Sequence, residues 1–127
     1  MPAQARLVIG LVGAVIMLVS SVPHSLLGWP AQRQMLLQSQ VPAEAILGLS
    51  VGWHFGAVAI AVFGFIATVS FLQVMRGHPP HMRATTIIGV AYTCFGLWAW
   101  WVTREAFALT FVVPGLLILV GSLGQRR

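Results

Sequence analysis

Apolar residues fill four long stretches of the chain, and short polar segments separate them. The stretches cover about residues 7–27, 45–75, 84–103 and 106–123. A helix that crosses the hydrocarbon core of a bilayer needs about 17 to 25 apolar residues, so each stretch predicts one membrane-spanning helix. The second is long enough to tilt or to project from the membrane. None alternates polar and apolar positions over ten-residue blocks, which disfavours a membrane β-barrel.

The polar segments predict how the helices are connected. Between Pro30 and Pro42, glutamines and one arginine surround a few apolar residues, a mixture typical of a short helix lying on the membrane surface. Residues 76–83 contain two central prolines and predict a tight turn. Residues 103–105 leave room only for an antiparallel hairpin between the last two spans.

Composition supports the same class of protein. Of the 127 residues, 58% are hydrophobic and 7% are charged, against about 25% charged in a soluble domain. So little charge excludes a soluble enzyme and a disordered tail, and the single cysteine, Cys94, excludes a disulfide scaffold. We therefore expect an all-α fold: a transmembrane four-helix antiparallel bundle forming one domain over residues 1–127, with a short interfacial helix between helices 1 and 2.

The seven cations are all arginines, and their distribution predicts the orientation. Five flank one end of the spans and two flank the other. The first group is Arg6, Arg76, Arg83, Arg126 and Arg127, and the second is Arg33 and Arg104. The positive-inside rule places both termini in the cytoplasm, with the chain in a bacterial inner membrane. The first stretch is too long for a signal-peptide core and lacks a small-residue cleavage site, so we expect it to remain as a helix.

The net charge of +5 raises the question of a partner. A basic soluble chain would suggest nucleic acid, but these arginines flank apolar segments, so anionic lipid headgroups are the expected partner and nucleic acid is not. The headgroup contacts are assigned to Arg76, Arg83, Arg126 and Arg127.

Glycines in the second stretch predict close helix packing. Gly48, Gly52 and Gly56 recur every four residues and share one helix face. Small residues let membrane helices approach closely, so this face predicts a seam, either within the chain or with another copy or another membrane protein. Weaker signals of the same kind are Gly10, Gly13, Gly64, Gly89 and Gly96.

Two histidines lie inside the apolar stretches. His24 is near the outer end of the first, and His54 is in the outer half of the second, at a similar depth. Ser20 and Ser50 precede them by four residues, so each hydroxyl could hold one ring nitrogen. An ionisable group inside a membrane is a functional candidate by default, although a hydrogen-bonded structural histidine is the alternative.

If the histidines are functional, their number limits what they bind. Two facing histidines are the minimum for axial ligation of a b-type haem and half of a copper or zinc site. No third or fourth ligand stands out, so a closed zinc site is not expected. The buried hydroxyl of Tyr92 also needs a partner, for which Thr68 and Ser70 are candidates.

Two short motifs carry a resemblance. The first is His24-Ser25-Leu26-Leu27-Gly28, and the second is Trp53-His54. They resemble a set of small four-helix bacterial membrane proteins that share a His-Ser-x-x-Gly and Trp-His pattern. Members often have an acidic residue after the glycine, where this chain has Trp29. The resemblance implies the same membrane fold and brings no activity with it.

These observations favour a protein that is not an enzyme. No nucleophile with its base, paired carboxylates or thiol pair is present. The leading hypothesis is a small subunit or scaffold of a membrane assembly, formed with copies of itself or with a larger complex. The alternative is a redox protein that binds haem b or a metal through His24 and His54. Transport is disfavoured because no membrane acid is available to couple ions, although passive conduction stays open.

Overall fold

The computed structural model describes residues 1–123, and Arg126 and Arg127 lie outside this range. The described chain is helical apart from short connections. Its elements are α1 (Ala3–Pro23), a π-helical turn (His24–Gly28), α2 (Trp29–Gln38), α3 (Ala43–Met75), α4 (Arg83–Thr103), a 3-10 turn (Ala106–Ala108) and α5 (Leu109–Leu123). Four helical segments are long and apolar enough to cross a membrane, so the chain is a multi-pass membrane protein with an all-α fold.

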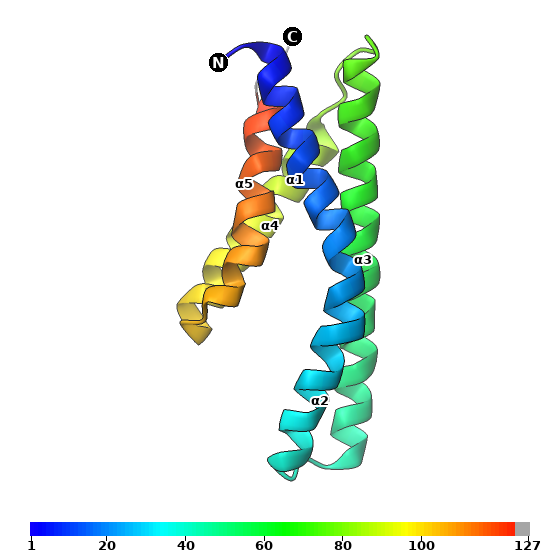
Figure 1. Ribbon diagram of the computed structural model, residues 1–127, viewed down its shortest axis with the longest axis vertical. Coiled ribbons are helices and arrows are strands. Elements are labelled where there is room, and N and C mark those ends of the chain that lie inside the picture. Colours follow the sequence, from blue (N-terminus) through cyan, green and yellow to red (C-terminus); the bar gives the residue numbers. More distant parts are fainter. Residues whose placement is uncertain (124–127) are drawn as a thin grey trace.

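The first span is longer than expected. α1, the π turn and α2 form one continuous helix of 36 residues, which runs beside α3 (Figure 1). Pro30 lacks an N–H and its ring would clash with the carbonyl four residues earlier, so it normally ends a helix. The wider π turn directly before α2 takes up this conflict. The short helix expected between the first two spans is therefore present as α2, and it continues the first span directly.

The helices pack side by side in the order α4, α5, α1, α3. α1 packs against both α3 and α5, α5 also packs against α4, and α3 and α4 have little contact. The start of α1, the end of α5 and the α3–α4 connection lie at one end of the molecule (Figure 1). Away from that end the α4–α5 pair diverges from the pair formed by α3 and the first span. The expected antiparallel four-helix arrangement is confirmed, with an opening between α3 and α4.

Glycines make the close contacts within the chain. A Cβ on Gly10 would lie 2.9 Å from the Cα of Gly121 on α5, and a Cβ on Gly64 would lie 2.5 Å from the backbone nitrogen of Leu18 on α1. Between α4 and α5 the same role falls to Gly89, Gly96 and Gly115. The close contacts between helices of the chain therefore include the glycines that the sequence analysis named as weaker packing signals: Gly10, Gly13, Gly64, Gly89 and Gly96.

The regular glycine face of α3 points away from the rest of the chain. A Cβ on Gly48 or Gly52 would meet no atom within 4 Å, and one on Gly56 would meet only the Nε2 atom of His24, at 3.8 Å. A seam within the chain therefore does not form at Gly48 and Gly52. Large apolar side chains beside them are also exposed: Leu47 by 69% and Val51 by 68%.

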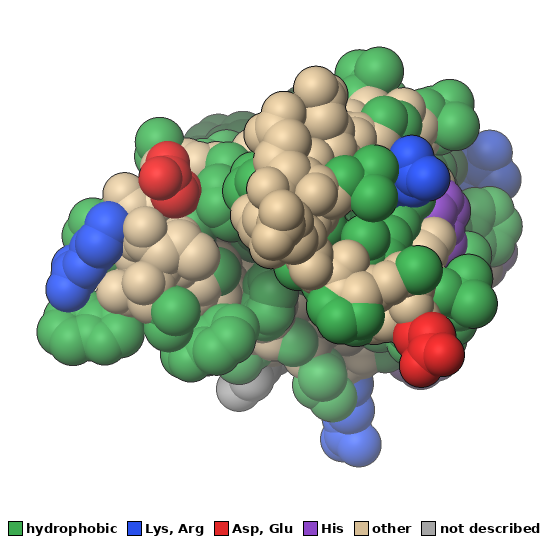
Figure 2. Space-filling model, turned by 90° about the horizontal axis from the view of Figure 1, so that it is seen from below, with side chains coloured by type: hydrophobic (Ala, Val, Ile, Leu, Met, Phe, Trp, Pro, Cys, Tyr) green, Lys and Arg blue, Asp and Glu red, His purple; other side chains and the backbone are tan. Residues whose placement is uncertain are grey.

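The two halves of the molecule differ in length. α3 has 33 residues and is about 50 Å long, against about 32 Å for the 21 residues of α4. The hydrocarbon core of a bilayer is about 30 Å thick. The α2–α3 hairpin therefore extends beyond the α4–α5 turn (Figure 1). Seen from this end, uncharged side chains and backbone fill the centre of the view, apolar side chains surround them, and the few charged groups lie apart from one another (Figure 2).

Candidate functional site

The site is built around Trp53, which joins α3 to the π turn. Its indole stacks on the imidazole of His24, with ring centroids 4.6 Å apart and planes 7° from parallel. Its Nε1–H donates to the backbone carbonyl of His24 at 2.8 Å. Gly28 makes room for this indole, because a Cβ there would lie 2.8 Å from the Trp53 ring. A buried tryptophan N–H needs an acceptor, and here the acceptor is on the neighbouring helix.

Trp29 connects the second histidine to this group. Its ring lies 6.1 Å from that of Trp53 and 5.9 Å from that of His54, which it meets edge-on. We call His24, Trp29, Trp53 and His54 the aromatic cluster. The structure thus places both predicted histidines in one cluster, but Trp53 and Trp29 mediate between them.

The serines do not act as expected. The Ser20 hydroxyl donates to the carbonyl of Met17 at 2.7 Å. His54 is held by the backbone carbonyl of Ser50, 2.8 Å from its Nδ1, and not by the Ser50 hydroxyl. Since a carbonyl can only accept, Nδ1 carries the proton and the lone pair lies on Nε2. The expected support of each ring by a serine hydroxyl is therefore corrected to a main-chain contact at His54 alone.

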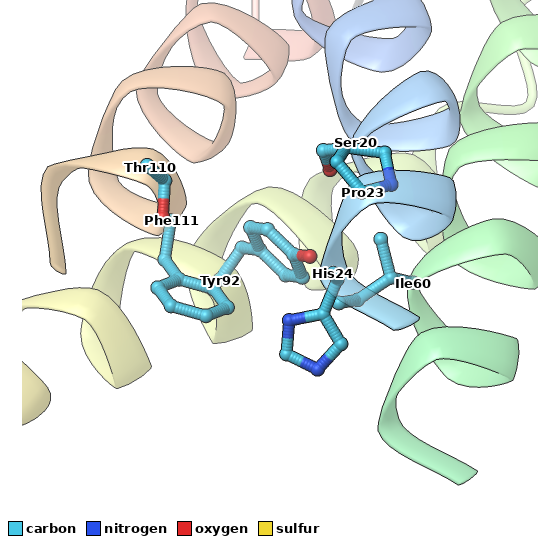
Figure 3. Close-up of a pocket in the computed structure, with 7 residues that line it drawn as sticks. All are labelled: Ser20, Pro23, His24, Ile60, Tyr92, Thr110 and Phe111. Carbon is cyan, nitrogen blue, oxygen red and sulfur yellow. The ribbon is translucent and has the colours of Figure 1, made fainter. Parts of the chain in front are cut away.

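A cavity of about 230 Å³ lies where the two halves of the molecule diverge. Side chains from the first span, α3, α4 and α5 surround it (Figure 3). Its lining residues are Ser20, Pro23, His24, Ile60, Tyr92, Thr110 and Phe111. His54 is not among them and is exposed, so only one of the two imidazoles reaches the cavity.

The positions of His24 and His54 determine whether they can hold a haem or a metal ion together. Axial ligation of a b-type haem requires two imidazoles on opposite faces of one macrocycle. Here His24 lines the cavity and is stacked on Trp53, whereas His54 lies outside it. The arrangement therefore does not fit a haem held by both histidines. Within residues 1–123 no group of three or more histidine, cysteine or acidic side chains is placed to hold a metal ion.

The sequence analysis named Thr68 and Ser70 as candidate partners of the Tyr92 hydroxyl, and the structure does not place either of them in that role. Thr68 and Ser70 donate to carbonyls of their own helix, at 2.7 and 2.8 Å. The Tyr92 ring instead tilts against Phe111, with centroids 5.5 Å apart, and its hydroxyl points from α4 toward the first span (Figure 3). The pairing of Tyr92 with His24 across one cavity was not predicted.

Comparison with known proteins identifies no relative. No family model, curated protein or solved structure matches the chain. The class of the protein, a multi-pass helical membrane protein, is therefore established by its helices alone, and its function is argued from the geometry above.

Proposed function

We propose that this chain is a non-enzymatic subunit of an assembly in a bacterial inner membrane. The open glycine face of α3 packs against a helix of another chain. One observation carries the proposal: Gly48 and Gly52 have no neighbour within 4 Å of a built Cβ, although the chain uses its other helical glycines for close packing. Exposed Leu47 and Val51 border the same region.

Membrane physics supports this use of the glycines. Lipid tails remove the hydrophobic drive between helices, so association depends on close van der Waals contact at small residues. A second copy in the same membrane has the same orientation, and a two-fold axis along the membrane normal brings its α3 parallel to the first. Glycines spaced by four residues allow this parallel crossing. A copy of the same chain is therefore the simplest partner, and a larger complex is the other form of the proposal.

The proposal also includes the orientation of the chain in the membrane. Arg6, Arg76 and Arg83 belong to the end of the molecule where α1 begins and α3 connects to α4. By the positive-inside rule this end faces the cytoplasm. Arg76 and Arg83 then meet anionic headgroups of the inner leaflet, where each basic side chain contributes about 1 kcal/mol of attraction.

Substitution of Gly52 tests the assembly. Gly52→Leu adds a side chain to the open face, at a position where a Cβ meets no atom of the described chain within 4 Å. We expect the wild-type chain to elute as a dimer in mild detergent and the variant as a monomer, with the same helical circular dichroism. Val90→Leu is the matched control, because Val90 is 47% exposed and lies on α4, a helix that the proposed interface does not use. An unchanged elution of Gly52→Leu would overturn the proposed interface.

A cross-linking experiment separates the two forms of the proposal in native membranes. Cys94 is exposed, so it is first replaced by alanine, and Gly48→Cys is then the single thiol. Oxidation should link two copies through residue 48 if the partner is the same chain. A cross-link to a different protein at this position would instead identify a larger complex, and no cross-link at all would contradict both forms.

A further inference from the structure

Two polar side chains face the cavity with no partner inside the described chain. Tyr92 is only 9% exposed, and its hydroxyl makes no hydrogen bond within residues 1–123. The imidazole of His24 also makes none there, since the bond from Trp53 goes to the His24 backbone. One ring nitrogen of His24 faces the side on which Tyr92 and Phe111 lie (Figure 3). A phenol hydroxyl at a largely apolar cavity wall needs a hydrogen-bond partner, so this pair favours a ligand that carries a hydrogen-bond acceptor.

The hydroxyls of the other polar lining residues donate to carbonyls of their own helices. The hydroxyl of Ser20 donates to the Met17 carbonyl at 2.7 Å, and that of Thr110 donates to the Phe107 carbonyl at 2.6 Å. The remaining walls are the apolar side chains of Pro23, Ile60 and Phe111. The cavity therefore offers an apolar interior with two free polar groups, which is typical of a small-molecule site.

Size and position narrow the ligand further. An apolar cavity of about 150 Å³ can hold benzene, so about 230 Å³ has room for a substituted six-membered ring. The cavity lies among the membrane-spanning helices, between α3 and α4, which have little contact, so we expect a ligand to enter it from the bilayer. The ligand that fits these features is apolar, contains a ring and carries oxygen acceptors. A bare acyl chain has no acceptor for the Tyr92 hydroxyl.

We propose that this cavity binds the ring headgroup of a lipid-soluble quinone. The Tyr92 hydroxyl donates to one ring carbonyl, and the N–H of His24 provides the second polar contact. The ring itself fills the space between Ile60 and Phe111. Gly48 and Gly52, which carry the assembly proposed above, do not line this cavity, so the quinone proposal is tested independently of that assembly.

Binding of duroquinone to the purified full chain tests the site. Its ring is fully methylated, so it does not add to the thiol of exposed Cys94. Durene, which has the same ring and methyl groups without the oxygens, is the matched ligand. Both are titrated calorimetrically at a fixed detergent concentration. We expect duroquinone to bind more tightly than durene, because only duroquinone accepts hydrogen bonds.

Variants then assign the contacts. Tyr92→Phe removes the hydroxyl and keeps the ring against Phe111, so it should weaken duroquinone binding roughly five- to tenfold, as expected for one hydrogen bond, and leave durene unchanged. Ser70→Ala removes a hydroxyl outside the cavity and should change neither ligand. Thr110→Phe, at an exposed position of the rim, should exclude both ligands while preserving the fold.

Three results would overturn the proposal. Equal affinities for duroquinone and durene would show that the cavity accepts any apolar ring. Unchanged duroquinone affinity in Tyr92→Phe would show that the hydroxyl does not recognise an oxygen. Binding that survives Thr110→Phe would place the ligand elsewhere on the protein and would equally contradict this site.

Discussion

Trp53 holds His24 twice, since its indole lies flat on the imidazole and its N–H donates to the carbonyl of the same residue. One side chain of α3 therefore fixes both the ring and the backbone at the start of the π turn. This contact sets the direction in which His24 meets the cavity, and it ties the first span to α3 near the point where the two halves of the molecule diverge.

Removal of this hydrogen bond should weaken the fold. Trp53→Phe keeps an aromatic ring but loses the N–H donor, so we expect the free energy of unfolding to fall by about 1 kcal/mol. Reversible denaturation in mixed micelles, followed by circular dichroism, measures the change. Trp98→Phe alters an exposed tryptophan of α4, near the α4–α5 turn, and should leave the stability nearly unchanged. Equal stabilities of the two variants would refute the role given to Trp53.

Glycine substitutions should separate the inner and outer faces of α3. A Cβ on Gly64 would lie 2.5 to 2.6 Å from the backbone of Leu18, so Gly64→Ala should lower the free energy of unfolding by about 1 to 3 kcal/mol. Gly52→Ala meets no atom of the chain and should be neutral or slightly stabilising for the monomer. The same denaturation assay compares them, and a similar loss in both would contradict the packing described here.

The orientation can be checked with single cysteines in a Cys94→Ala background. Ser39→Cys, in the α2–α3 turn, should react with a membrane-impermeant thiol reagent added outside the cell. His78→Cys, in the α3–α4 connection, should react only after the membrane is permeabilised. The physical reason is the excess of arginines at the end that contains His78. The opposite labelling pattern would invert the proposed topology.

The geometry of the aromatic cluster also predicts an optical result. Because only His24 lines the cavity, protein purified from cells supplied with haem should lack the intense Soret absorption of a haem ligated by two histidines. A Soret band lost in both His24→Ala and His54→Ala would show that the two rings rearrange to bind haem. It would restore the redox hypothesis drawn from the sequence.

Sequence patterns predicted the number of spans, and the limits of the last three, because burial in lipid depends on local composition. The join at Pro30 was not predictable in the same way. Proline normally ends a helix, and the π turn before it is held by Trp53, which is remote in sequence. Similarly, the four-residue spacing identified a face on which close approach is allowed, but not whether the chain itself fills that face.

Prediction of the candidate site from the sequence was limited in the same way. The positions of His24 and His54 along their spans predicted that the two residues lie at a similar depth. The structure places both of them in the aromatic cluster. How each helix is rotated about its axis decides which side chains meet, and this depends on contacts such as Gly64 against Leu18. That rotation turns His24 toward Tyr92, a residue whose partner the sequence could not specify.

The central position of α1 has a consequence for how the protein is made. Among the described helices, α1 precedes both of its partners, α3 and α5, in the chain. The side of α1 that carries Gly10 and Gly13 packs on α5, which follows α3 and α4. We therefore expect the close packing on this side of α1 to form only after α3 and α4 have been made.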